Sequence, residues 1–366
     1  MATPGRNVDP YEALLVVSFG GPERPDDVRP FLENVTRGRG ISADRLTEVA
    51  GHYFRFGGSS PINDQNRALV AALEQELDRM SLSLPVYWGN RNWHPYLADE
   101  LARMRDDGVR RAAVFITSAY SSYSGCRQYR EDLAAAATAV GPGAPRMDRL
   151  RHCFDHPGFV RANADAVFGA LADLPTDVAD GARLVYVTHS IPTAMAETSG
   201  PAAGAYVAQH RAVAAAVTRD VEVRTEARHD YDLVYCSRSG PPQVPWLEPD
   251  VNDHLKTLAA AVPGVVLAPI GFVSDHMEVV FDLDTEALGT ADELRLPAAR
   301  AATAGTHPAF VAAICDLLVE RAAVERGEPV IRASIGPPGP SPEVCPAGCC
   351  PNLVGPRRPA LCGSSV

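Results

Sequence analysis

Residues 13–19 read A-L-L-V-V-S-F and run directly into the turn residues G-G-P. A short apolar run bounded in this way is typical of a buried strand in a parallel sheet. Five similar runs follow, at residues 84–88, 112–117, 184–188, 233–236 and 265–269. Between them lie Ala-rich segments with the apolar spacing of amphipathic helices, at residues 63–80, 96–107, 128–140, 159–174 and 205–220. This alternation predicts an α/β fold built from doubly wound, Rossmann-like sheets.

The chain is long enough for more than one such unit. Its 366 residues and 46% hydrophobic content suit two domains with full cores. We therefore predict two Rossmann-like domains, at residues 1–175 and 176–326. Residues 327–366 are too rich in Pro, Gly and Cys for a helix or a central strand, so we predict an extended tail there.

Charge and hydropathy exclude several classes of function. Asp and Glu number 45 against 34 Lys and Arg, a net charge of −11, which argues against nucleic acid or an anionic membrane as partner. Residues 1–9 have no apolar signal core, and no stretch reaches the about 18 uninterrupted apolar residues of a membrane-spanning helix. We expect a cytoplasmic protein without a membrane span, whose eight cysteines are not paired in structural disulfides.

A row of acidic residues follows the last apolar run. Residues 271–286 read G-F-V-S-D-H-M-E-V-V-F-D-L-D-T-E, and a helix that begins near His276 would place Glu278, Asp282 and Glu286 on one face. Such a ladder of carboxylates supplies hard oxygen ligands for a metal ion. The alternative is a solvated acidic face, the usual role of charged residues on a helix. The apolar residues between the acids favour a partly buried ladder, where acids need a partner or a function.

The ends of the predicted strands carry the other candidate residues, because ligands in doubly wound folds bind beyond the carboxyl ends of the strands. His189 directly follows the fourth apolar run, in T-H-S-I-P, so one crevice could hold both His189 and Glu278. Imidazole and carboxylate can each bind a divalent metal ion and accept a proton near neutral pH. Taken alone, His189 could equally be structural, and we interpret the other nine histidines as structural or surface residues.

Motifs for other enzyme classes fail on their context. Gly38, Gly40 and Ala43 fit G-x-G-x-x-A, but the preceding L-E-N-V-T-R does not resemble a strand, which argues against a dinucleotide site. The sequence has no Walker A lysine motif and no G-x-S-x-G nucleophile turn. The loop T-R-G-R-G instead carries Arg37 and Arg39, which could pair with substrate carboxylates or, alternatively, form a solvated charged turn.

Together, the strand-end motifs resemble those of one family. They are S-F-G-G-P, L-E-N-V-T-R-G-R-G, F-G-G-S-S-P-I-N, T-H-S-I-P, S-R-S-G-P-P-Q-V-P-W-L-E-P-D-V and G-F-V-S-D-H-M-E-V-V-F-D-L-D. In this order, over roughly residues 12–319, they resemble the ferrochelatases, and most of all the actinobacterial coproporphyrin ferrochelatases. The resemblance implies a chelatase-like fold, with a four-stranded parallel sheet in each of the two Rossmann-like domains. It also implies a lyase of haem biosynthesis that inserts ferrous iron into coproporphyrin III, giving coprohaem and two protons.

The resemblance also implies roles for the acidic ladder and the strand-end histidine. His189 and Glu278 would be the catalytic pair that flanks the macrocycle. Asp282 and Glu286 would continue the metal-binding ladder along a helix with a π-type irregularity. Metallation requires iron to exchange water for protein ligands while two pyrrole protons leave, and His189 and Glu278 can serve both purposes. Which of the two accepts the protons stays open, as does whether Asp282 and Glu286 pass iron inward or protons outward.

A flat porphyrin with four propionates needs apolar walls and a cationic or hydrogen-bonding rim. Aromatic residues near strand ends are candidates for the walls, although each could instead be an ordinary core residue: Phe19, Tyr120, Tyr123 and Trp246. Candidates for the rim are Arg37, Arg39, Ser60, Asn63 and Ser122. No long apolar insertion lies near residues 31–61, so we expect a soluble handover of the porphyrin, with a downstream haem-synthesis enzyme as a further partner.

Half of the cysteines gather at the end of the chain, in C-P-A-G-C-C-P-N-L and at Cys362. Thiolates at this density are typical of zinc or iron–sulfur sites. Several ferrochelatases hold a [2Fe–2S] cluster with three tail cysteines and one internal cysteine, and the resemblance implies the same cofactor here, on Cys126, Cys345, Cys349 and Cys350. Cys362 is an alternative to Cys349, and a disordered reactive tail is the alternative to a cluster. The other three are expected to be core thiols: Cys153, Cys236 and Cys315.

Three functions remain open at this point. The first is the iron-inserting chelatase. The second is a chelatase of the same fold that acts on protoporphyrin IX or inserts another metal, such as cobalt. The third is a non-catalytic porphyrin or haem carrier, in which the acidic ladder would have no purpose.

Overall fold

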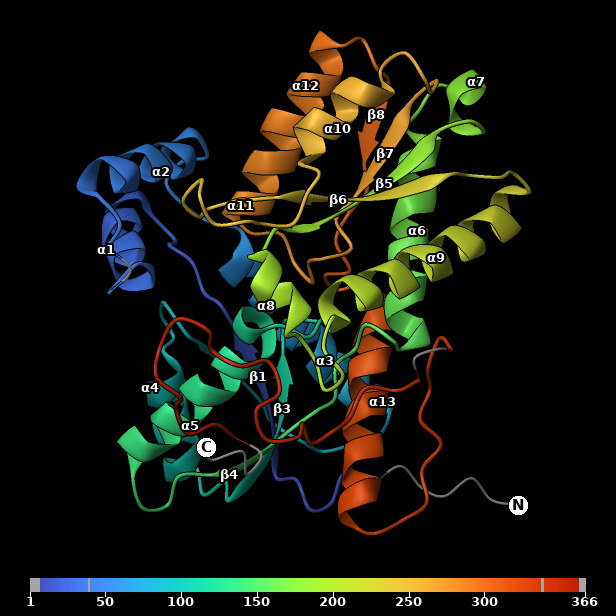
Figure 1. Cartoon of the computed structure of the whole chain (residues 1–366). Coiled ribbons are helices and arrows are strands. Elements are labelled where there is room, and N and C mark those ends of the chain that lie inside the picture. The colour runs from blue at the N-terminus through green and yellow to red at the C-terminus, as the bar shows by residue number, and fades with distance from the viewer. Residues whose placement is uncertain (1–6, 39, 337–338, 362–366) are drawn as a thin grey trace, which may run out of the picture.

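The computed structural model describes residues 7–38, 40–336 and 339–361. It contains two four-stranded sheets with helices packed around both (Figure 1). Two residues predicted for the site, Arg39 and Cys362, lie outside the described residues.

The first sheet has the strand order β2-β1-β3-β4, and all its strands are parallel. Its strands are β1 (Ala13–Ser18), β2 (Val86–Asn90), β3 (Arg111–Ile116) and β4 (Arg146–Arg149). The central strand β1 is buried along its whole length, which explains why every residue from Ala13 to Val17 is apolar.

The second sheet repeats this arrangement with the order β6-β5-β7-β8, again all parallel. Its strands are β5 (Arg183–His189), β6 (Tyr231–Cys236), β7 (Val265–Ala268) and β8 (Ala298–Arg300). The predicted pair of four-stranded parallel sheets is therefore confirmed. Strands β4 and β8 were not among the apolar runs, because both are short edge strands in which charged or small residues replace the large apolar ones.

Five helices lie where the amphipathic segments were predicted: α3 (Ile62–Arg79), α4 (Leu97–Asp106), α5 (Gln128–Val140), α6 (Pro157–Ala172) and α9 (Ala205–Thr225). The chain also forms α1 (Pro25–Val35), α2 (Ala43–Arg55), α7 (Thr176–Ala179), α8 (Thr193–Glu197), α10 (Val251–Leu258), α12 (Leu288–Glu293) and α13 (Pro308–Glu325). A short π-helix, η1 (Tyr123–Arg127), leads into α5. The acidic ladder lies on α11 (Met277–Val279) and the π-helix η2 (Val280–Ala287), as the resemblance implied.

The two halves of the chain exchange helices. Helix α6 follows the first sheet in sequence but packs against α9 and the strands β7 and β8 of the second sheet. Helix α13 follows the second sheet but packs against α3 and β3 of the first sheet, and it also contacts α6 (Figure 1). The domain bounds at residues 175 and 326 stay a prediction.

The helices α6 and α13 begin in the same way. The sequence before and into α6 is H-P-G-F-V, and that of α13 is H-P-A-F-V. In each, Pro occupies the first turn and the preceding histidine accepts a backbone N–H through Nδ1: His156 from Gly158 at 3.1 Å, and His307 from Ala309 at 3.2 Å. Both histidines therefore act as N-caps, which satisfy donors that a helix start leaves without a partner.

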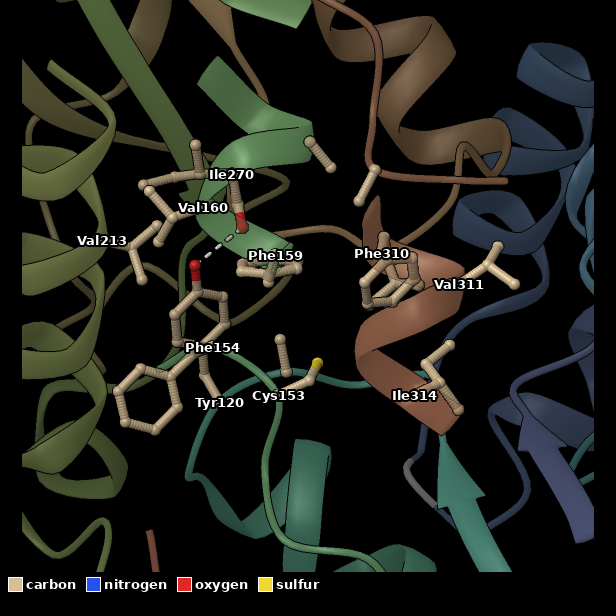
Figure 2. Close-up of a cluster of buried hydrophobic side chains, with 14 of the residues drawn as sticks. Tyr120, Cys153, Phe154, Phe159, Val160, Val213, Ile270, Phe310, Val311 and Ile314 are labelled. Carbon is tan, nitrogen blue, oxygen red and sulfur yellow. Dashed lines mark hydrogen bonds between the residues drawn. The ribbon is translucent and has the colours of Figure 1, made fainter. Parts of the chain in front are cut away.

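The largest hydrophobic core runs without interruption between the two sheets. Figure 2 shows part of it, in which Phe159 of α6 and Phe310 of α13 meet with their ring centroids 5.6 Å apart. Tyr120, which follows β3, is buried in the same core and donates a hydrogen bond from its hydroxyl to the carbonyl of Ile270 at 2.9 Å. The halves are therefore joined by packed side chains rather than by a loose linker.

The tail has no helix or strand in residues 327–336 and 339–361, in agreement with the prediction of an extended segment. It lies against the first half and supplies partners for buried groups there. Ser341 donates its backbone N–H to the Asp155 carboxylate at 2.7 Å, and the Arg149 guanidinium donates to the carbonyl of Pro342 at 3.2 Å. The tail is therefore part of the folded structure.

Candidate functional site

The strand-end histidine and the first acid of the ladder face each other. His189 is the last residue of β5, and its Nε2 lies 3.7 Å from Oε2 of Glu278 on α11. Its Nδ1 contacts the carbonyl oxygen of Ser190. Because a carbonyl oxygen only accepts, Nδ1 carries a hydrogen, and Nε2 is the ring nitrogen that takes up or releases a proton toward Glu278. The exposed fraction of the side chain is 32% for His189 and 54% for Glu278.

The two side chains influence each other's charge. Burial alone would lower the pKa of His189, but the contact with Glu278 and its negative charge outweigh this effect, so the pKa is raised above its ordinary value. The pair therefore combines a histidine that protonates more readily than usual with a carboxylate, and both groups bind divalent metals. That combination suits a site where a metal ion arrives as protons leave.

The next two acids continue away from this pair along the π-helix. Burial, together with the negative charges of Glu278 and Glu286, raises the pKa of Asp282 to about 6 against the opposing hydrogen bond from Ser237. Burial and the nearby Asp250 carboxylate also raise the pKa of Glu286. Acids that take up protons near neutral pH can pass either protons or cations along the row.

Two residues beside the ladder were not singled out in the sequence. His276 lies with Nδ1 4.0 Å from Oε2 of Glu278, although its sequence context led us to group it with the structural or surface histidines. Ser237, just after β6, donates its hydroxyl to Oδ2 of Asp282 and has a positive φ of 60°. Such a backbone conformation is strained for serine and is often found at functional sites. His276 could have been identified from the sequence by its position two residues before Glu278.

Helices α1 and α2 form a wall against the ladder. A buried cluster joins Met277 and Phe281 to apolar residues of these helices: Val28, Phe31, Leu32, Leu46, Ala50 and Tyr53. The His52 ring stacks on Phe281 with centroids 3.8 Å apart and an angle of 6° between the rings. The π-helix therefore packs against α1 and α2 through its apolar side chains, and its acidic side chains are not part of this buried cluster.

The residues predicted for the porphyrin rim divide into exposed and buried ones. Arg37 is exposed in the turn after α1. Ser60 and Asn63 are buried, and both make hydrogen bonds within the protein. Asn63 donates from Nδ2 to the Gly21 carbonyl at 3.2 Å and accepts from Asn90 at Oδ1, also at 3.2 Å. Ser122 is buried as well, and its hydroxyl oxygen accepts the backbone N–H of Gly125 at 2.8 Å. The substrate roles of these residues stay predictions.

The aromatic candidates also differ in exposure. Phe19 is exposed at 37%, with the Arg91 guanidinium 5.9 Å from its ring centroid. Tyr123 is half-buried and bonds Oε2 of Glu131 at 3.2 Å through its hydroxyl. Trp246 is half-buried. Its backbone forms an isolated β-bridge with Pro192, which lies in the loop after His189. These three stay predictions for the walls, whereas the buried position of Tyr120 in the core agrees with its structural alternative.

The cysteines predicted to share a cofactor gather in one place. A buried cluster consists of Cys126 on η1 and three tail residues, Cys345, Cys349 and Cys350. The Arg149 guanidinium lies 3.5 Å from Sγ of Cys345, and the backbone N–H of Gly200 donates to Sγ of Cys350 at 3.1 Å. Hydrogen bonds from Cys126 and Cys349 lower the pKa of Cys345. The remaining described cysteines, Cys153, Cys236 and Cys315, are buried core thiols as predicted.

Among the described residues, neither the acidic ladder with His189 nor the cysteine cluster has the geometry of a complete metal-binding site. In residues 7–38, 40–336 and 339–361, no three or more His, Cys, Asp or Glu side chains form a ready metal-holding group. Over the same described ranges, no helix is both long and apolar enough to cross a membrane.

Known proteins resemble this chain over nearly its whole length. A coproporphyrin III ferrochelatase of Streptomyces griseus is 58% identical, and the match covers 98% of each chain. A coproporphyrin III ferrochelatase of Streptomyces coelicolor is 57% identical over 98% of this chain and 97% of its own. A ferrochelatase of Rhodopirellula baltica is 48% identical over 97% of both chains.

A solved structure shares the fold at low sequence identity. SirB from Bacillus subtilis, determined with Fe³⁺, superposes with a TM-score of 0.52 at 12% identity, covering 88% of this chain and 99% of SirB. The family model named Ferrochelatase matches residues 11–322, which include both sheets, His189 and the whole acidic ladder. The chain therefore belongs to the ferrochelatase family.

Proposed function

We propose that the protein is a coproporphyrin III ferrochelatase, which inserts ferrous iron into coproporphyrin III and releases two protons. The observation that carries this proposal is the full-length match, at 57% and 58% identity, to two enzymes of that name. The expected fold, family and enzyme class agree with it. The product, coprohaem, would be consumed by a later enzyme of haem synthesis.

The geometry supports His189 and Glu278 as the catalytic pair. Each pyrrole N–H that iron replaces must lose its proton, and the metal must find protein ligands while it loses water. Nε2 of His189 and Oε2 of Glu278, 3.7 Å apart, offer a base and a ligand at the same point. Because the charge of Glu278 raises the pKa of His189, the two groups titrate together, and the pair rather than either residue has the titration that governs the reaction.

Asp282 and Glu286, further along the π-helix, are proposed to serve the same reaction. They follow Glu278 at intervals of four residues on the π-helix, and burial raises the pKa of both. A carboxylate with a pKa of about 6 can release a proton to bind a cation and take it back at neutral pH. The ladder therefore provides stations for iron, for the leaving protons, or for both.

The rim and walls of the porphyrin site are proposed from residues whose side chains are exposed or half-buried. Arg37 offers a guanidinium for a propionate, and the Phe19 ring offers an apolar surface beside the guanidinium of Arg91. Ser60, Asn63 and Ser122 already use their polar groups inside the protein, so a direct role for them requires exchange of these bonds for bonds to the substrate. Tyr123 and Trp246 remain proposed wall residues.

The four gathered cysteines fit a [2Fe–2S] cluster in their chemistry. Soft thiolates are the ligands of such clusters, and a cluster with four thiolates carries negative charge that a buried site must balance. The Arg149 guanidinium and the Gly200 N–H point at two of the sulfurs. We include a cluster on Cys126, Cys345, Cys349 and Cys350 in the proposal, where it would join η1 to the tail. A cytoplasmic location is also included, since all seven described cysteines are free thiols.

Anaerobic metallation tests the function. The purified protein is incubated with Fe²⁺ and either coproporphyrin III or protoporphyrin IX, and loss of porphyrin fluorescence is followed. We expect metallation of coproporphyrin III, and its rate should fall by at least about 10²-fold in His189→Ala and Glu278→Gln, because a general acid–base group contributes about 10²–10⁴-fold. Binding of both porphyrins without metallation would favour a carrier. Faster reaction with protoporphyrin IX, or with Co²⁺ in place of Fe²⁺, would assign another substrate.

A further inference from the structure

The helix that carries Glu278 begins without a cap of its own. His276 occupies the N-cap position, and its side chain makes no capping hydrogen bond. Helix starts leave backbone N–H groups without partners, and a side chain usually supplies the missing acceptor. In this protein the acceptors come from residues more than 200 positions away in the sequence.

Two side chains of the first half accept backbone N–H groups here, one from Met277, the first helical residue, and one from Asp275, which precedes the N-cap. The Ser60 hydroxyl oxygen accepts from Met277 at 3.2 Å, and Oε1 of Gln65 accepts from Asp275 at 2.8 Å. Gln65 lies in the first turn of α3, and Ser60 directly precedes that helix. The bonds from Asp275 and Met277 therefore connect the backbone on both sides of His276 to the opposite half of the molecule.

Ser60 is itself held tightly. Its backbone N–H bonds to the Pro22 carbonyl at 2.8 Å. A Cβ added to Gly21 would lie 2.8 Å from the Cβ of Ser60, so the G-G-P turn after β1 fits closely around it. Glycine at this position allows the turn to approach the serine. The acceptor is therefore a fixed point rather than a mobile surface hydroxyl.

The second half holds the same segment from its other side. The Arg300 guanidinium pairs with the Asp275 carboxylate and, through Nε, with Asp284 at 3.1 Å. The backbone N–H of Gly305 donates to the Val273 carbonyl at 2.8 Å. Residues 273–277 are thus fixed between the halves, with Glu278 immediately after them. His189 belongs entirely to the second half, so the contacts with Ser60 and Gln65 influence where Glu278 stands relative to it.

We propose that Ser60 and Gln65 are positioning residues that set the distance between Glu278 and His189 from the opposite half of the molecule. Ser60 caps the first residue of the Glu278 helix, and Gln65 holds the backbone just before its N-cap. This inference rests on the proposed function, because it takes Glu278 to act in metallation. The loss of the Gln65 contact would leave the proposed porphyrin-binding residues in place but would let the catalytic carboxylate move.

Gln65→Leu tests the proposal, because leucine has a similar size but no acceptor. We expect kcat to fall by about tenfold, since misplacement of a reacting group by one ångström costs up to about 10²-fold. Porphyrin affinity, measured by fluorescence quenching without iron, should stay the same. Gln65→Glu keeps an acceptor oxygen and should restore most of the rate. Gln75→Leu, at an exposed position of the same helix, is the matched control and should behave like the wild type.

Backbone hydrogen exchange gives a readout that is independent of activity. The amides of residues 275–281 should exchange faster in Gln65→Leu than in the wild type or in Gln75→Leu. If the wild type does not metallate coproporphyrin III, the proposed function fails while the exchange data still decide whether the cap exists. Unchanged kcat and exchange in Gln65→Leu would overturn the inference, as would a Gln65→Glu variant as slow as Gln65→Leu.

Ser60→Ala separates positioning from substrate contact. A lower kcat at unchanged porphyrin affinity supports the capping role. Weaker porphyrin binding at unchanged kcat would instead assign the hydroxyl to the substrate and remove Ser60 from the proposal. The two outcomes use the same fluorescence and rate measurements as the Gln65 variants.

Discussion

At the scale of the residue, Asp282 lies between the proposed catalytic pair and the outer end of the ladder. Asp282→Asn removes its charge but keeps its shape and the hydroxyl contact from Ser237. We expect iron insertion to slow by about tenfold, less than for the general acid–base pair itself, while porphyrin binding is unchanged. Steady-state rates at varied Fe²⁺ with saturating coproporphyrin III measure the effect.

Asp284→Asn is the matched control for that substitution. Asp284 lies on the same π-helix but pairs with Arg300, away from His189. Asparagine at this position keeps an oxygen that can accept from Arg300, so the variant should retain nearly the full rate. Equal losses in both variants would mean that the helix, rather than the ladder, had been damaged, and an Asp282→Asn enzyme with the wild-type rate would leave the ladder without a role in the reaction.

The residues of the site could be predicted only in part from the sequence. His189 and Glu278 could be brought together because each follows an apolar run, and parallel strands end at one edge of a sheet. The contacts that fix them could not. The contacts of Ser60 and Gln65 depend on how the two halves pack. The contact of Ser237 with Asp282 depends on a positive φ that the sequence S-R-S-G does not specify.

At the scale of the element, the start of α6 depends on a histidine that must stay neutral. His156 caps the helix through Nδ1, and burial lowers its pKa to about 4. A histidine in the unfolded chain titrates near 6.5. Because the folded pKa is the lower one, the stabilisation is complete above about pH 6.5 and is lost as the pH falls toward 4, by up to about 1.4 kcal/mol per pH unit.

His156→Asn tests this pH dependence, because asparagine also caps helices but does not titrate. Urea unfolding at pH 7.5 and pH 5 should show a smaller loss of unfolding free energy for His156→Asn than for the wild type. The buried His152 and His210, whose pKa values burial lowers to about 3, will still contribute in both proteins. An identical loss in the two proteins would show that His156 is already charged in the fold.

Elements were predictable where one physical signal dominated. The central strands are apolar because both faces of their sheets are covered, whereas β4, with the sequence R-M-D-R, lies at an edge and shows no such signal. Helix α13 could have been found from the repeat of H-P-x-F-V at α6. Only the family resemblance predicted the π-helix, because a spacing of four residues between the acids fits an ordinary α-helix equally well.

At the scale of the whole molecule, the tail joins distant parts of the chain. Cys126 belongs to η1, the other three clustered cysteines to the tail, and Gly200, which bonds Cys350, to the second half. If these thiols hold a cluster, Cys126→Ser should lose the iron and labile sulfide of the wild type. Its midpoint of thermal unfolding should fall by about 5 °C or more, because a ligand that binds only the folded state stabilises it.

Cys315→Ser is the control for the thiol substitution, since Cys315 is buried in α13 away from the other sulfurs. It should keep the wild-type content of iron and sulfide. Limited proteolysis gives a second comparison, in which only Cys126→Ser should be cut more quickly within residues 327–361. A wild-type protein without labile sulfide, or a Cys126→Ser protein that retains it, would exclude the proposed cluster.

The exchange of α6 and α13 has a consequence for how the protein is made. During synthesis the first sheet leaves the ribosome early, but the helix that covers β3 is encoded only at residues 308–325. Until then, the apolar face that α13 buries has no partner from its own chain. Helix α6 likewise lacks the strands it packs on until residues 265–300 have been made. Nascent chains shorter than about 325 residues are therefore expected to engage chaperones, and folding should complete only near the end of translation.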